Sequence, residues 1–160
     1  MSTKFITNQE KLLSEVISNI LPSTKKLYML VGYFYFSGFE ELYKSLEDKE
    51  VKILVGLEIE KDLLNKIKEV EFIQQLNLSR GKIKDNFNKS LVGIFNDTDY
   101  FDSEEKQNAF MLFLKKIKDG TLEIKKTSQP NYAKLYIFEH KEEHNQGGET
   151  PGVVITGSSK

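Results

Sequence analysis

Apolar residues recur every three or four positions in four stretches of the chain, and this spacing predicts amphipathic helices. Three of the stretches begin with a serine, threonine or aspartate followed three residues later by glutamate, which is the pattern of a capping box. The expected caps are Thr7 with Glu10, Ser37 with Glu40, and Asp102 with Glu105. The remaining helix is expected over roughly Asp62 to Leu76, while Pro22 is expected to end the first helix and Gly120 the last.

Shorter apolar runs between these helices predict the strands of a sheet. Leu27 to Phe36 is almost continuously apolar, as in a strand buried on both faces, and Val51 to Leu57 follows one helix later. This strand–helix–strand unit favours parallel pairing. Thr121 to Lys126, Ala133 to Glu139 and Val153 to Thr156 are joined only by loops and are expected to pair as an antiparallel meander. The pattern predicts one α/β domain with a mixed sheet.

The net charge of −1 gives the chain no overall basic field that would attract nucleic acid. Any contact with a polyanion would therefore need a local patch of positive charge. The best such patch consists of Lys115, Lys116, Lys118, Lys125 and Lys126. We expect the first three to be solvated lysines, which are favoured at the C-terminal end of a helix.

The chain contains no cysteine, so disulfides and thiolate metal sites are excluded, and a reducing compartment such as the cytoplasm is expected. Its N-terminus lacks the apolar core of a signal peptide. No apolar run approaches the ~20 residues that a membrane-spanning helix requires. We therefore expect a soluble, cytoplasmic protein that has no membrane partner.

Two local patterns have a chemical and a structural interpretation. The aromatic run Tyr33 to Phe36 offers rings on which bases can stack, but such a run in a strand is more typical of a core, which we predict. His140 and His144 match the H-x-x-E-H pattern of zinc peptidases. That site needs a helix, whereas this segment follows a strand and runs into Gly147 and Gly148. We predict two solvated loop histidines and no metal.

The C-terminal part of the chain holds the main candidate for a binding site. It reads Y-A-K-L-Y-I-F-E from Tyr132 and, after a loop, G-V-V-I-T-G-S-S. Strand alternation places Tyr132 and Lys134 on one side. Gly157, Ser158 and Ser159 are small residues whose amides and hydroxyls can surround an anionic oxygen. The residues alone leave two alternatives open: a phosphate clamp of Lys134 with the serines, or a solvated lysine beside an ordinary turn.

These residues resemble the motif of the phospholipase D superfamily, H-x-K-x-x-x-x-D followed by Gly-Ser and usually an asparagine. The corresponding residues here are Tyr132, Lys134, Glu139, Gly157, Ser158 and Lys160, in that order. Tyr132 stands where the family has its nucleophilic histidine, and Glu139 stands at the aspartate position. We expect Tyr132 to be a buried packing residue that has replaced the nucleophile, which makes any catalytic role of Tyr132 or Glu139 doubtful.

The segment from Ile20 to Glu58 also resembles the start of phospholipase D-like modules that precede superfamily-two helicases in bacteria. The resemblance implies a phospholipase D-like α/β fold over residues 1–160, with the mixed sheet sandwiched between helices. It also implies chemistry that needs no metal and no cofactor. The chain would be a fragment of a longer helicase, and one motif per chain implies a homodimer with both Lys134 residues near the two-fold axis.

Three functions remain open. The leading hypothesis is a module of a nucleic-acid-processing protein that binds the phosphodiester backbone of DNA or RNA through Lys134 and Ser158, with little or no hydrolysis. The second is an active, metal-independent phosphodiesterase or nuclease in which Tyr132 or a partner chain restores the nucleophile. The third is a protein-docking domain without affinity for phosphate.

Overall fold

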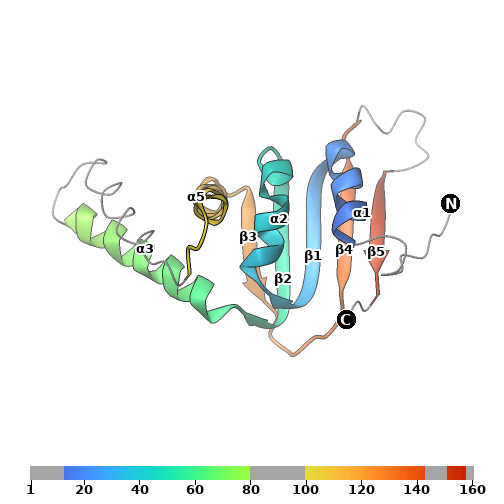
Figure 1. Cartoon of the computed structure of the whole chain (residues 1–160). Coiled ribbons are helices and arrows are strands. Elements are labelled where there is room, and N and C mark those ends of the chain that lie inside the picture. Colours follow the sequence, from blue (N-terminus) through green and yellow to red (C-terminus); the bar gives the residue numbers. More distant parts are fainter. Residues whose placement is uncertain (1–12, 80–99, 143–150, 158–160) are drawn as a thin grey trace.

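A computed structural model describes residues 13–79, 100–142 and 151–157 of the chain, which form a five-stranded mixed sheet with helices (Figure 1). The elements in chain order are α1 (Leu13–Ile20), the 3-10 turn η1 (Leu21–Ser23), β1 (Thr24–Phe34), α2 (Phe36–Leu46), β2 (Glu50–Ile59), α3 (Lys61–Ser79), α5 (Glu104–Asp119), β3 (Leu122–Lys126), β4 (Leu135–His140) and β5 (Gly152–Thr156). The predicted α/β class and the predicted strands are thus confirmed, with strand ends displaced by at most three residues.

The strand order is β3-β2-β1-β4-β5, so β1 lies at the centre. It pairs in parallel with β2 and antiparallel with β4, while β5 runs antiparallel to β4. The predicted meander is correct for β4 and β5 but wrong for β3, which pairs in parallel with β2 at the other edge. The reason is that α5 precedes β3 and supplies the crossover that a parallel strand needs. In this register Leu122 lies opposite Val51 and Ile124 lies opposite Ile53, which extends the apolar face.

Helices α1, α2 and α5 lie on one face of the sheet and enclose an aromatic core (Figure 1). Phe36 and Phe113 are fully buried, with ring centroids 5.7 Å apart at 83°. Phe39 meets Phe113 at 5.2 Å and 76°, and Phe34 stacks on it from β1 at 6.2 Å. The edge-to-face contacts join α2 to α5, and the stacked contact joins α5 to the sheet, so together they fix the helix-covered face.

No helix covers the opposite face within the part of the chain that the structure describes, and α3 extends away beyond the β3 edge (Figure 1). We call this surface the open face. Its apolar side chains are Tyr28, Leu30, Leu54, Leu135, Ile137 and Val154. Leu54 is 40% exposed, Ile137 37% and Val154 60%. The described helices therefore do not sandwich the sheet, and β1 is not buried on both faces as its apolar sequence predicts.

Two predicted helix caps are wrong in their residues. Helix α2 begins at Phe36, so Ser37 lies inside it, and the Phe36 amide donates to Oε2 of Glu60 at 2.9 Å. A carboxylate from the end of β2 therefore occupies the place of a local cap. In α5 the cap is Ser103 rather than Asp102, and its Oγ accepts from the amide of Lys106 at 3.1 Å.

The remaining helix predictions have mixed outcomes. Gly120 ends α5 as predicted, with the left-handed φ of 77° that favours glycine. The predicted fourth helix is α3, and α1 gives way to the 3-10 turn that contains Pro22. Thr7 and Glu10 lie outside the described residues.

Lys116 is not the solvated lysine that its position near the end of α5 predicts. Only 3% of it is exposed, and its Nζ donates to the carbonyl of Glu47 at 3.4 Å and to the carbonyl of Lys49. Burial lowers the pKa of Lys116, and nearby carboxylates such as Asp48 partly oppose this shift. Lys116 thus satisfies carbonyls between α2 and β2, whereas Lys115 and Lys118 are exposed as predicted.

Candidate functional site

The carboxyl ends of four strands lie side by side at one end of the sheet, which we call the carboxyl edge. Strands β1, β2 and β3 are parallel, and β5 runs in the same direction because β4 is antiparallel to both β1 and β5. In Figure 1 this is the lower edge, near the C-terminus. Open α/β sheets bind ligands outside the carboxyl ends of their strands, at the point where the strand order reverses. Here the order reverses at β1, which has β2 on one side and β4 on the other.

Lys134 lies at this edge, directly before β4. Leu135 pairs with Leu30 on β1 and with Thr156 on β5. The Oγ1 hydroxyl of Thr156 donates to the carbonyl of Lys134 at 3.4 Å. The half-buried Lys134 is therefore beside the end of β5, where Gly157 follows.

Gly157 directly follows β5 in a backbone conformation that favours glycine. Gly157 has a φ of 145°, a conformation that side chains rarely adopt. The lysine and the glycine of the predicted clamp thus lie at one edge of the sheet. Ser158 and Ser159, the other two predicted phosphate-binding residues, lie outside the described part of the chain.

The connection from β3 to β4 is held tightly across the ends of the neighbouring strands (Figure 1). The amide of Thr127 donates to the carbonyl of Val55 at 2.9 Å, and that of Asn131 donates to the carbonyl of Gly56 at 3.1 Å. A Cβ atom at position 56 would overlap the carbonyl oxygen of Asn131, so only glycine allows this approach. Asn131 Oδ1 then accepts from the amide of Ala133 at 2.8 Å. These bonds fix the backbone immediately before Lys134.

Tyr132 is 78% exposed, so the prediction of a buried packing residue is wrong. The strand alternation that predicted Tyr132 and Lys134 on one side does not apply to them, because β4 begins only at Leu135. Its hydroxyl has no hydrogen bond to any other described residue. Tyr132 is therefore a surface side chain at the carboxyl edge.

Glu139 does not join Lys134 at this edge. It lies near the far end of β4, opposite Lys26, and forms an ion pair with Lys25 at 3.1 Å. Five residues of extended strand separate it from Lys134 by about 17 Å. The spacing of the sequence motif is present, but an extended backbone carries the two side chains apart, so Glu139 has a structural role at the opposite edge.

The aromatic run at the end of β1 divides into buried and exposed rings. Phe34 and Phe36 are buried as predicted, whereas Tyr33 is 54% exposed and Tyr35 59%. The two tyrosine rings lie 6.4 Å apart between centroids, with 27° between their planes. The prediction that the whole run is core is thus wrong for both tyrosines. The strict alternation of tyrosine with phenylalanine in the sequence could have indicated which rings are exposed, because only tyrosine carries a polar hydroxyl that suits solvent.

Acidic side chains lie at the β2 end of the same edge. Glu58 is opposite Tyr33, and Glu60 caps α2. Tyr100 is buried, and this burial raises its pKa, with Glu60 and Asp62 adding to the effect. Its hydroxyl has no hydrogen-bond partner among the described residues, so Tyr100 is a neutral phenol that supplies no base to the edge.

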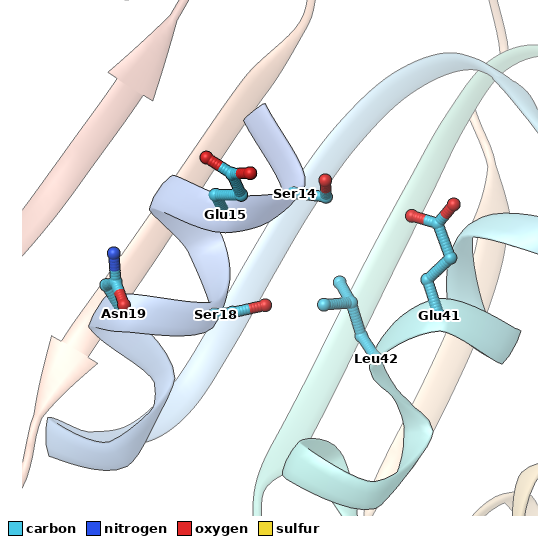
Figure 2. Close-up of a pocket in the computed structure, with 6 residues that line it drawn as sticks. All are labelled: Ser14, Glu15, Ser18, Asn19, Glu41 and Leu42. Atoms are coloured by element: carbon cyan, nitrogen blue, oxygen red, sulfur yellow. The ribbon is translucent and has the colours of Figure 1, made fainter. Parts of the chain in front are cut away.

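A hollow lies on the helical side of the molecule, between α1 and α2 (Figure 2). It has a volume of about 540 Å³. Its lining residues are Ser14, Glu15, Ser18, Asn19, Glu41 and Leu42. Two carboxylates and no cation line this hollow, so it is a poor place for a phosphate.

Of the two histidines that the zinc pattern singled out, the structure describes only His140. His140 ends β4 opposite Thr24 and is half-buried rather than in a loop, while His144 lies outside the described residues. Across residues 13–79, 100–142 and 151–157, no three histidine, aspartate or glutamate side chains are grouped closely enough to hold a metal ion. The helices of these same segments include none that is long and apolar enough to cross a membrane.

Comparisons of the chain with protein-family models, with curated proteins and with solved structures found no match. The function is therefore inferred from the geometry of the carboxyl edge and from the motif in the sequence.

Proposed function

We propose that this chain is a phospholipase D-like module that binds the phosphodiester backbone of nucleic acid, with Lys134 as its phosphate ligand. The observation that carries the proposal is the position of Lys134 at the carboxyl edge, beside the end of β5 and the Gly157 turn. A lysine ammonium is a compact point charge suited to a phosphate oxygen. Backbone amides in a glycine turn add donors to the same anion. Both features support a role of Lys134 as a phosphate ligand.

The proposed module binds with little or no hydrolysis. Tyr132 takes the place of the nucleophilic histidine, and a tyrosine attacks phosphorus only after losing a proton whose ordinary pKa is ~10. No described residue accepts a hydrogen bond from its hydroxyl, so no general base is in place there. Glu139, the other doubtful catalytic residue, is paired with Lys25 at the opposite edge. The same proposal, following the resemblance, includes a place for this module before a helicase in a longer chain. It also includes helices on both sides of the sheet.

The second candidate is an active phosphodiesterase that works as a dimer. One observation favours it: Tyr132 is 78% exposed, so its hydroxyl is accessible to a phosphorus bound near Lys134. A partner chain would then have to supply the base and the acid. This candidate predicts a covalent tyrosine–phosphate intermediate, which the binding module does not form.

Binding by titration of a fluorescein-labelled oligonucleotide tests the leading proposal. Lys134→Ala is expected to weaken binding about tenfold and to lower the slope of log K against log salt by about 0.7, as for the loss of one phosphate contact on a single strand. Lys118→Ala, an exposed lysine on α5, is the matched control and should bind like wild type. Equal binding by wild type and Lys134→Ala would refute the role of Lys134.

A cleavage assay on plasmid and single-stranded DNA, with and without chelator, separates the two candidates. The binding module leaves both substrates intact. Cleavage that resists chelator and disappears in Lys134→Ala would support the phosphodiesterase instead. A DNA–protein adduct trapped on wild type but absent from Tyr132→Phe would identify the nucleophile.

A further inference from the structure

We infer that Tyr33 and Tyr35 form a base-stacking platform for single-stranded nucleic acid at the carboxyl edge of the sheet, the edge that also holds Lys134. This inference rests on the proposed function and names the substrate class of the same site. Both rings are more than half exposed, in a segment whose alternate residues Phe34 and Phe36 are buried. With centroids 6.4 Å apart and planes within 27° of each other, the tyrosines form a pair of neighbouring, nearly parallel rings.

The backbone that carries the two tyrosines is anchored by the residues between and beside them. Phe34 stacks on Phe113, and the amide of Phe36 donates to Glu60, so the backbone on both sides of Tyr35 is anchored. Tyr33 is itself part of the β1–β2 ladder, opposite Glu58, and the Tyr35 carbonyl accepts from the amide of Gly38 at 3.2 Å. A fixed aromatic surface loses little conformational entropy when a ligand binds, which favours its use in recognition.

The platform and the proposed phosphate ligand lie at the same edge of the sheet, because β1 ends at Phe34 and Lys134 directly precedes the antiparallel β4. Leu135 is opposite Leu30, and Tyr33 stands three residues further along β1. Three residues of strand span about 10 Å. A single strand of a few nucleotides can therefore reach from Lys134 to the tyrosines.

The connection from β3 to β4 passes close to the start of the platform. The carbonyl oxygen of the preceding Asn131 lies 3.8 Å from the Cβ position of Gly32, which is directly before Tyr33. The carboxylate of Glu58, opposite Tyr33, repels phosphate and so favours a strand with its bases over the rings and its backbone toward Lys134.

The arrangement selects unpaired bases. In a duplex each base is already stacked between its neighbours, whereas a single strand can place its bases on aromatic side chains. Every base has a π-face, so stacking of this kind tolerates many sequences. The structure therefore assigns the site to single-stranded nucleic acid with little sequence preference.

Three probes of equal length test the inference on the full chain: a labelled single-stranded oligothymidylate, the same sugar–phosphate strand without bases, and a duplex. The double variant Tyr33→Ala/Tyr35→Ala is expected to lose about tenfold affinity for the oligothymidylate and none for the abasic strand. Tyr33→Phe/Tyr35→Phe keeps both rings and should bind like wild type. The duplex should bind more weakly than the single strand. Melting temperatures confirm that each variant is folded.

The outcomes separate this inference from the proposed function. Lys134→Ala should weaken both single-stranded probes equally, because it removes a phosphate contact. If Lys134→Ala has its effect but the double alanine variant binds both strands like wild type, the platform is wrong and the phosphate site stands. If Lys134→Ala has no effect while the tyrosines matter only for the strand with bases, the phosphate site is wrong. The platform would be overturned if the double alanine variant lost the same affinity for both single-stranded probes. It would also be overturned if the wild type bound duplex and single strand equally, or bound none of the probes.

Discussion

The two faces of the sheet use similar residues to different effect. Val51, Ile53 and Val55 of β2 point to the helix-covered face and are buried, whereas Leu54 between them is 40% exposed on the open face. The same strand thus supplies apolar side chains to both sides, but α2 and α5 cover only one of them. Apolar sequence therefore indicates the capacity for burial, and the presence of a covering layer decides whether burial occurs.

The open face is ordered in rows across the strands. One row holds Tyr28, Ile137 and Val154, and the next holds Leu54, Leu30 and Leu135. The row nearest the opposite edge is charged, with Lys26 paired to Glu50 at 3.4 Å. The apolar rows are thus bounded by ion pairs, and a bounded apolar patch is characteristic of a surface that binds another surface.

The largest contrast is expected between Phe113→Ala and Leu54→Ala. Phe113 is fully buried among the rings of α2 and β1, so its removal should lower the free energy of unfolding by about 3–5 kcal/mol. Leu54→Ala should cost about 1 kcal/mol or less, because much of the side chain is already in solvent. Urea denaturation at one pH measures both. A Leu54→Ala cost close to that of Phe113→Ala would mean that the open face is covered in solution.

Lys116→Met tests a polar contact beneath the covered face. Because burial lowers the pKa of Lys116 in the folded chain, the unfolded chain binds more protons between that lowered value and the ordinary ~10.4. The contribution of Lys116 to stability is therefore lowest below this window and rises with pH through it. Urea midpoints of wild type should rise relative to those of Lys116→Met as pH increases through the window. Parallel pH profiles would contradict the burial of a titrating lysine.

The smallest effect on stability is expected at Tyr132. Its ring is largely in solvent, so Tyr132→Ala should change the free energy of unfolding by no more than about 0.5 kcal/mol. Thermal melts of wild type, Tyr132→Ala and Tyr132→Phe should nearly coincide. A loss of several kcal/mol would show that a layer covers the carboxyl edge in solution.

Local patterns in the sequence predicted the elements but not their non-local partners. The spacing of apolar residues predicted α3 and β1 to β5, because the formation of each element is encoded by the residues within it. It did not place β3 beside β2, since the five residues Leu122–Lys126 suit either neighbour. Nor did it identify the cap of α2, because Glu60 lies 24 residues from Phe36.

The candidate site was predictable only in part. The motif located Lys134 and Gly157, whose neighbourhood follows from the antiparallel pairing of β4 and β5. Its spacing did not show that Glu139 lies near the far end of β4, because residues five apart in an extended strand are carried away from each other. It also missed Tyr33 and Tyr35, whose exposure depends on which face the helices cover.

The central position of β1 has a consequence for the order in which the chain can fold. Its two neighbours lie at very different distances along the sequence: β2 follows after one helix, whereas β4 places His140 opposite Thr24. Closing so long a loop is costly in entropy, so pairing with β4 is expected to be slow and late. During synthesis on the ribosome, the unit from β1 to β2 emerges first, with one edge of β1 lacking its partner. That edge is open to pairing with other chains until β4 arrives, and this interval is when the nascent protein is most exposed to aggregation.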